Sequence, residues 1–161
     1  MPSSLISTRF LAIDLGDKRT GLAVADSATR IVSPLAVLEV SIAERTGEAL
    51  LDALVAAVNA QFSPHARYEL VIGLPLNMDG TQGPRARLVR AFATRIVARF
   101  TPPRTLHFQD ERLTSADADW QLARSGKTRG EKKQLRDALA AAALLRDFLA
   151  TLPPPDPDQS A

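Results

Sequence analysis

The sequence predicts a single α/β domain built around a mixed five-stranded sheet with helices on its faces. Three apolar runs follow one another closely at the start of the chain, whereas the later apolar runs alternate with helical patterns. Strands that are joined through helices are expected to be parallel, with right-handed crossovers. With 161 residues, 45% of them apolar, the chain is long enough to form one well-packed core.

The first two predicted strands are joined by a tight polar loop. An apolar run that begins at Phe10 ends in Asp14, the chain turns through residues 16–19, and a second apolar run ends at Asp26. The period-2 alternation of strands places Phe10, Ala12 and Asp14 on one face. A carboxylate in a strand is costly unless it is compensated. Asp14 is therefore either a turn residue capped by backbone N–H groups or a ligand for a divalent metal.

Apolar spacing, capping residues and helix breakers place the later elements. In order, we expect a strand at 31–40 with Pro34 at an edge position, a helix at 41–59 opened by a capping box of Ser41 and Glu44, a strand at 68–73, a polar loop at 74–83, a helix at 84–100, a strand at 105–109, a helix from 114 to 126, and a helix at 131–149. Residues 1–8 are expected to be flexible, residues 9–151 to form the single domain, and residues 152–161 to be a disordered, Pro-rich tail.

The composition excludes several classes of site. There is no cysteine, which excludes disulfides and thiolate metal sites and favours a reducing compartment. The only histidines are His65 and His107, so a zinc site is not expected. No apolar run approaches the length needed to span a membrane, and the first residues lack the pattern of a signal peptide. We therefore expect a soluble, cytoplasmic protein that makes no contact with membranes.

Basic residues are concentrated in two blocks, although the formal net charge is only +2. The stretch from residue 80 to residue 109 contains six arginines and no acid. Such blocks either attract a polyanion, most commonly nucleic acid, or form the solvated faces of helices. The first block contains Arg85, Arg87, Arg90, Arg95, Arg99 and Arg104, and the second contains Arg124, Lys127, Arg129, Lys132, Lys133 and Arg136.

Three acidic positions are predicted to converge at one end of the sheet. Asp14 ends the first strand, Asp110 and Glu111 end the last one, and the helix that carries Asp137 must cross back over the sheet. Functional groups of open α/β sheets gather at the carboxyl ends of strands, near the point where the strand order reverses. Carboxylates suit hard divalent cations, and three of them suit a two-ion site. Alternation along the last strand favours Glu111 as the ligand and leaves Asp110 to pair with Arg112 or to cap the next helix.

Four stretches of the chain, 14–21, 73–81, 110–115 and 136–141, resemble the motifs of the YqgF (RuvX-like) family. They read Asp-Leu-Gly-Asp-Lys-Arg-Thr-Gly, Gly-Leu-Pro-Leu-Asn-Met-Asp-Gly-Thr, Asp-Glu-Arg-Leu-Thr-Ser and Arg-Asp-Ala-Leu-Ala-Ala, in the family's order and with fitting spacing. Members of this family are described as Holliday-junction resolvases and as nucleases that mature pre-16S ribosomal RNA. The resemblance implies a ribonuclease-H-like fold.

The resemblance also implies an acidic triad of Asp14, Glu111 and Asp137 that holds Mg²⁺ or Mn²⁺. With such ions, a water attacks a phosphodiester in line, in either an endonuclease or an exonuclease reaction. The sequence departs from the family pattern at Asp17, Thr20 and Ser115, and none of these changes removes a carboxylate. The groups that we expect to contact nucleic acid are Lys18, Arg19, Asn77, Arg85, Arg112, Lys127, Arg129, Lys132 and Lys133.

Two other classes of function stay open at this point. The first is a nucleic-acid-binding or ribosome-associated factor in which catalysis is weak or absent. The second is a phosphate-binding protein of the sugar-kinase and actin group, which shares the Asp-x-Gly turn but needs two such domains around its nucleotide. The expected partner in the favoured interpretation is precursor ribosomal RNA or branched DNA, with the ribosome or its precursors as a further partner. Either a monomer or a homodimer fits, and a symmetric resolvase requires two sites.

Overall fold

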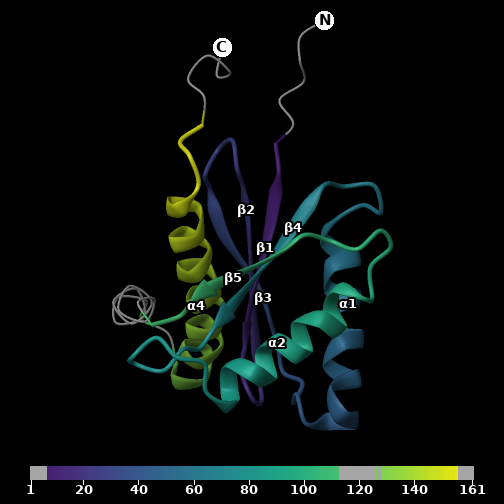
Figure 1. Ribbon diagram of the computed structural model, residues 1–161, viewed down its shortest axis with the longest axis vertical. Helices are drawn as coiled ribbons and strands as arrows, with labels where there is room; N and C mark the ends of the chain where they lie inside the picture. Colours follow the sequence, from purple (N-terminus) through teal and green to yellow (C-terminus); the bar gives the residue numbers. More distant parts are fainter. Residues whose placement is uncertain (1–6, 113–125, 127, 156–161) are drawn as a thin grey trace, which may run out of the picture.

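The computed structural model describes residues 7–112, 126 and 128–155. Its centre is a five-stranded sheet in the order β3-β2-β1-β4-β5 (Figure 1). The strands are β1 (Arg9–Leu15), β2 (Thr20–Asp26), β3 (Val32–Leu38), β4 (Tyr68–Leu74) and β5 (Leu106–Asp110).

The sheet is mixed, as the sequence predicts. Strand β2 runs antiparallel to both β1 and β3, whereas β4 is parallel to β1 and β5 is parallel to β4. The chain therefore leaves β1 in one direction to build β2 and β3, and in the other direction to build β4 and β5. The strand order reverses between β1 and β4, which is where open α/β sheets carry their sites. The predicted α/β class, number of strands and strand directions are confirmed.

Helices cover both faces of the sheet, and the number of helices in the described residues differs between the two faces. Helices α1 (Glu48–Gln61) and α2 (Pro84–Val97) pack on one face, and the long helix α4 (Arg129–Thr151) packs on the other (Figure 1). A short 3₁₀ turn, η1 (Glu44–Gly47), precedes α1. Among the described residues, no helix is both long and apolar enough to span a membrane.

The two faces of the sheet are built from side chains of different size. Even-numbered residues of β2 and β4 and odd-numbered residues of β1 bury large aliphatic groups against α1 and α2, as Leu11, Leu22 and Leu70 do. The opposite face carries mostly small residues, such as Ala12 and Ala23, under an alanine-rich stretch of α4. Small side chains on both surfaces let the α4 backbone approach the sheet closely.

Helix boundaries differ from the predictions where local backbone conformation intervenes. The predicted capping box at Ser41 does not open the helix, because Arg45 and Thr46 have left-handed φ values of 49° and 55°. A helical hydrogen-bond ladder cannot run through such residues, and α1 begins at Glu48. Thr128 and Glu131 form a reciprocal capping box, so α4 begins at Arg129 instead of residue 131.

Smaller shifts affect the other predicted elements, and some predictions lie outside the described residues. Strand β5 lies one residue later than expected, and α2 ends three residues earlier than expected. The predicted helix at 114–126 lies outside the described residues, apart from Gly126, as do residues 1–6 and 156–161 of the predicted flexible ends.

Candidate metal and nucleic-acid site

The centre of the candidate site is Asp14, near the carboxyl end of β1 and on the face that α4 covers. Its neighbour across the β1–β2 ladder is Gly21. A Cβ atom at Gly21 would lie 2.7 Å from the carbonyl carbon of Asp137 and closer still to its oxygen. Gly21 therefore allows the backbone of α4 to sit directly on β2, which brings Asp137 beside Asp14. Glycine inside a strand commonly marks such a close approach.

Glu111 reaches the same point from the far side of β4. It follows the last residue of β5, and its backbone N–H donates to the Leu74 carbonyl at 3.3 Å. Its carboxyl group forms a hydrogen bond with the carboxyl group of Asp14. Residues from β1 and from the end of β5, which are two strands apart in the sheet, therefore meet in one carboxyl pair.

Burial and mutual contact perturb the protonation of this pair. Burial, the hydrogen bond to Asp14 and the charge of Asp14 raise the pKa of Glu111 from 4.5 to about 9. Burial also raises the pKa of Asp14, and the nearby charge of Asp137 adds to this effect. Arg85 acts in the opposite direction on both pKa values. Two partly buried carboxyl groups in contact need a shared proton or a cation between them.

The third predicted ligand is held by an arginine. The carboxylate Oδ2 of Asp137 accepts a hydrogen bond from Arg19 Nε at 2.7 Å, and both side chains are about one-quarter exposed. Consequently, within residues 7–112, 126 and 128–155, no group of three His, Asp or Glu side chains is gathered around one possible metal position. The donor set nevertheless fits a hard divalent cation, because a carboxyl pair is in contact and a third carboxylate neighbours it.

Arg85, in the first turn of α2, closes the site on the side of the β1–β2 loop. Its Nη2 donates to the Leu15 carbonyl at 2.9 Å, and its Nη1 forms an ion pair with Asp17. Asp17 departs from the family pattern that the sequence resembles, and here its charge is compensated by Arg85. The arginine thereby fixes the loop that carries Lys18 and Arg19.

The loop between β4 and α2 is held by its own polar groups. The Asn77 N–H donates to the Thr81 carbonyl at 2.9 Å, and Asn77 Nδ2 donates to Thr81 Oγ1 at 3.0 Å. Asp79 accepts from the Thr81 N–H at 3.0 Å, and Arg112 Nη1 donates to the Met78 carbonyl at 3.2 Å. Asn77, predicted to contact substrate, thus organises this loop in the structure.

Asp110 and Arg112 form a local pair. Arg112 Nε lies 2.8 Å and its Nη2 2.6 Å from Asp110 Oδ2. The hydrogen bonds from Arg112 hold the pKa of Asp110 below its ordinary value. The alternation argument predicted this division, in which Glu111 faces Asp14 and Asp110 pairs with its neighbour.

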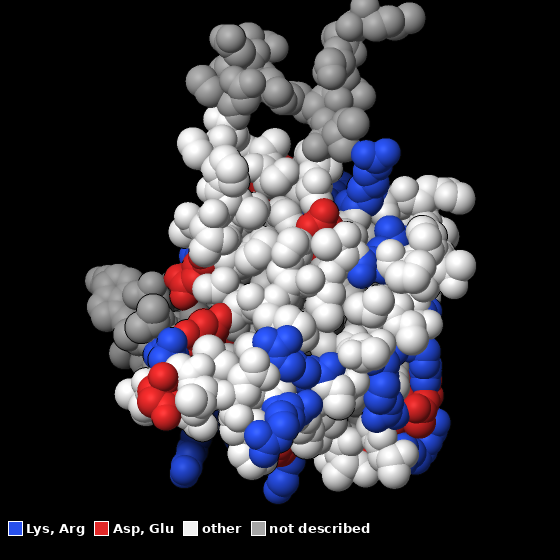
Figure 2. Space-filling model, viewed as in Figure 1, with Lys and Arg blue, Asp and Glu red and all other residues white. Residues whose placement is uncertain are grey.

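Three of the six arginines of the first basic block, Arg85, Arg95 and Arg99, pair with acids within the fold. Basic side chains are spread over the α2 side of the molecule, with acidic ones among them at the right of the view and others at the left, near the end of β5 (Figure 2). Arg99 pairs with Glu48 and Asp52 of α1, and Arg95 Nη2 lies 2.6 Å from Glu48. Arg90 Nε donates to Gln82 Oε1 at 2.7 Å. Two arginines of a block that contains no acid in sequence therefore pair with acids of the neighbouring helix α1.

The other predicted nucleic-acid contacts lie on two elements. Lys18 is exposed in the β1–β2 loop, and Arg129 and Lys133 are exposed in the first turns of α4, where Lys132 is half-buried. Lys127 lies outside the described residues. The acidic cluster is therefore bordered by cations from the loop on one side and from α2 on another.

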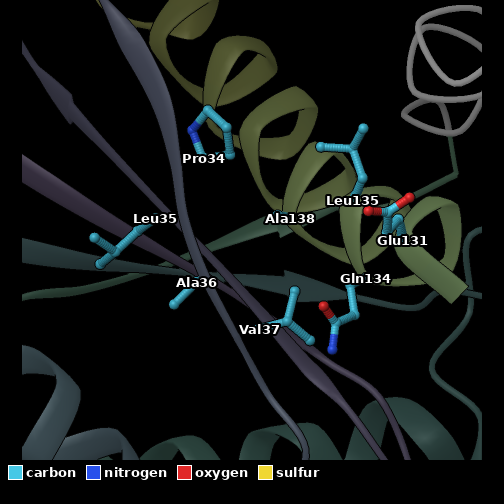
Figure 3. Close-up of a pocket in the computed structure, with 8 residues that line it drawn as sticks. All are labelled: Pro34, Leu35, Ala36, Val37, Glu131, Gln134, Leu135 and Ala138. Atoms are coloured by element: carbon cyan, nitrogen blue, oxygen red, sulfur yellow. The ribbon is translucent and has the colours of Figure 1, made fainter. Parts of the chain in front are cut away.

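A separate groove of about 320 Å³ lies between β3 and the N-terminal half of α4 (Figure 3). None of the predicted site residues lines it; its walls are Pro34, Leu35, Ala36, Val37, Glu131, Gln134, Leu135 and Ala138. Gln134 Nε2 donates to Glu39 Oε1 at 3.1 Å, which ties α4 to the end of β3. The groove and the carboxyl pair are distinct features of the same sheet face.

The sequence reasoning found the carboxylates but missed the glycines that bring them together. Gly21 and Gly73 occur inside apolar strand patterns. A glycine in such a pattern signals close approach of another group, and that signal was available in the sequence.

Residues 8–151 of the chain match the family described as "RuvX: Holliday junction resolvase". A protein of Anaeromyxobacter dehalogenans (strain 2CP-C), named "Putative pre-16S rRNA nuclease", is 40% identical over 141 residues, covering 88% of this chain and 96% of that protein. A protein of the same name from Thiobacillus denitrificans (strain ATCC 25259 / T1) is 39% identical over 138 residues, covering 86% and 88% of the two chains. Among solved structures, T. thermophilus RuvC in complex with Holliday junction substrate aligns with a TM-score of 0.49 and 19% identity, covering 88% of this chain and 93% of that one.

Proposed function

Because the chain belongs to the RuvX family of Holliday junction resolvases, we propose that it is a divalent-metal-dependent nuclease that hydrolyses phosphodiester bonds in structured nucleic acid. Precursor 16S ribosomal RNA is the favoured substrate, since the relatives that match almost end to end carry that name. The observation that supports catalysis is the partly buried contact between Asp14 and Glu111, beside Asp137, at the point where the strand order reverses.

In this proposal Asp14 and Glu111 would hold Mg²⁺ or Mn²⁺, and Asp137, which is bound to Arg19 here, would be the third ligand. When bound, such ions lower the pKa of water and neutralise the charge that develops on a phosphodiester. The Asp14–Glu111 pair would supply the affinity for the metal ion. Two neighbouring carboxylates that are partly removed from water repel each other when no cation is present, and a bound cation relieves this repulsion.

The arginines then have separate roles. Arg85 stays bound to the Leu15 carbonyl and keeps the loop beside Asp14 in place. Arg19, once free of Asp137, has a charged planar group with which it donates to a phosphate oxygen. Lys18, Arg129, Lys132 and Lys133 provide longer-range attraction for the backbone of the substrate, which makes binding depend on salt concentration.

The test is a cleavage assay with purified protein on three substrates: a precursor 16S ribosomal RNA fragment, a four-way DNA junction and a plain duplex. Each is incubated with EDTA, Mg²⁺ or Mn²⁺. We expect cleavage of the RNA precursor with metal and none with EDTA. Preferential cleavage of the DNA junction, together with a homodimer in solution, would replace ribosomal RNA by branched DNA as the substrate.

Asp14→Asn is the critical variant, since it removes a ligand charge at nearly constant volume. Its matched control is Asp79→Asn, which changes an acid that is exposed in the β4–α2 loop. We expect Asp14→Asn to abolish cleavage and Asp79→Asn to keep it. Tight binding of the RNA without cleavage under any metal condition would instead support a ribosome-associated binding factor.

A further inference from the structure

Glu111 crosses β4 to reach Asp14, and it does so over Gly73. Strand β4 lies between β1 and β5, and Gly73 pairs with Gln109 in the β4–β5 ladder. A Cβ atom at Gly73 would lie 2.7 Å from both Cγ and Cδ of Glu111, and closer still to Oε1. The side chain of Glu111 therefore occupies the volume in which any other residue at position 73 would carry its own side chain.

We propose that Gly73 is a positioning residue, whose missing side chain leaves the passage through which the Glu111 carboxyl meets Asp14. This inference rests on the proposed function, because it assigns a role to Gly73 in assembling that site. Neighbouring strands are about 4.8 Å apart, so β5 and β1 are separated by roughly 10 Å. The side chains of Glu111 and Asp14 must together span this gap, and a detour around an intervening methyl group would shorten the reach of the glutamate.

The contacts also indicate that the passage can be blocked without disturbing the fold. The three atoms nearest to a Cβ at position 73 all belong to the Glu111 side chain, whereas those nearest to a Cβ at Gly21 belong to the backbone of α4. Gly73→Ala should therefore move one flexible side chain and leave the strands in place. Alanine is also more favourable than glycine inside a strand. We expect the variant to melt at or above the temperature of the natural protein in EDTA.

The experiment compares Gly73→Ala with Glu111→Gln, Glu111→Asp and the Gly73→Ala/Glu111→Gln double variant. Gly130→Ala is the matched control, since no atom lies within 4 Å of a Cβ at that glycine. Mn²⁺ affinity is measured by the rise in melting temperature and by electron paramagnetic resonance titration. These two readouts are independent of cleavage, which is measured in parallel.

We expect Gly73→Ala to weaken Mn²⁺ binding at least tenfold and to reduce cleavage to the rate of Glu111→Gln. The double variant should lose no more than Glu111→Gln alone, because both changes act through one side chain. Glu111→Asp keeps the charge but is one methylene shorter, and should also lose affinity. Gly130→Ala should behave as the natural protein.

Two outcomes separate failure of this inference from failure of the proposed function. If Gly73→Ala keeps its Mn²⁺ affinity and cleavage while Glu111→Gln loses both, the passage is unimportant and the proposed function stands. If the natural protein neither binds Mn²⁺ nor cleaves nucleic acid, the proposed function fails. In that case a metal-free crystal structure of Gly73→Ala decides the present inference: contact of Glu111 with Asp14 in that structure would overturn it.

Discussion

The two faces of the sheet carry side chains of different size and have different roles. The face under α1 and α2 is filled by large aliphatic groups such as Leu70 and Ile72, both fully buried. The face under α4 carries alanines and two glycines, Gly21 and Gly73, and holds the carboxyl pair. The first face stabilises the fold through buried apolar surface, and the second provides space. The first is therefore damaged by removing atoms and the second by adding them.

The largest effect on stability is expected from Leu70→Ala, on the large-residue face. The variant loses the transfer free energy of the leucine side chain and leaves a cavity, at a cost of about 2–5 kcal/mol in the free energy of unfolding. Metal binding and cleavage should remain unchanged at temperatures where the variant is folded. Urea denaturation measures the first quantity, and a loss of Mn²⁺ affinity in the folded variant would mean that the two faces are coupled.

Gly21→Ala adds a single methyl group on the opposite face and should lower the free energy of unfolding by less than Leu70→Ala does. The methyl group collides with the backbone carbonyl of Asp137, so α4 must shift. Overpacking of this kind costs about 1–3 kcal/mol. Because Asp137 moves with the helix, metal binding should weaken together with stability, unlike in Leu70→Ala. Retention of natural stability and Mn²⁺ affinity would show that α4 adapts without moving Asp137.

The carboxyl pair of Asp14 and Glu111 should also make the free energy of unfolding of the metal-free protein depend on pH. The pKa of Glu111 is about 9 in the folded protein and 4.5 ordinarily, so the folded state binds the extra proton between these values. The free energy of unfolding should therefore fall as pH rises from about 5 to about 8, by on the order of 4 kcal/mol. Glu111→Gln in EDTA should flatten this dependence. An unchanged slope in the variant would assign the titration to other groups.

The smallest change is expected from Thr20→Val, on the large-residue face. Thr20 is fully buried, and its hydroxyl group has no hydrogen-bond partner among the described residues. Replacing it by a methyl group should raise the free energy of unfolding by about 1 kcal/mol. Thr81→Val is the control, because the Thr81 hydroxyl donates to Asp79 at 2.6 Å. Loss of this hydrogen bond should not stabilise the protein. A destabilised Thr20→Val would mean that the hydroxyl is satisfied by water.

The sequence predicted the parts of this molecule that depend on short-range patterns. Alternation and helical spacing yielded the five strands, their directions and three of the helices. The same alternation placed Glu111, and not Asp110, on the face of Asp14. These features depend on residues close together in the chain, so one sequence is sufficient to find them.

Features that depend on contacts between distant segments were not predicted. The pairing of Arg95 and Arg99 with Glu48 and Asp52 was not predicted, because these acids lie more than forty residues away in the chain. The hydrogen bond from Asn77 to Thr81 was likewise not predicted, because it depends on the fold of the β4–α2 loop. The start of α1 was misplaced because the left-handed conformations of Arg45 and Thr46 have no sequence signal in those residue types.

The ion pair between Arg19 and Asp137 joins residues 118 positions apart in the chain. During synthesis, the N-terminal strands emerge long before the helix that carries Asp137. Chains fold in the order in which they become available, and contacts between distant segments form last. The surroundings of Asp14, which include Asp137, are therefore complete only when α4 has been synthesised and packed on the sheet. Under the proposed function, the site that includes Asp137 is therefore completed only after α4 has been translated.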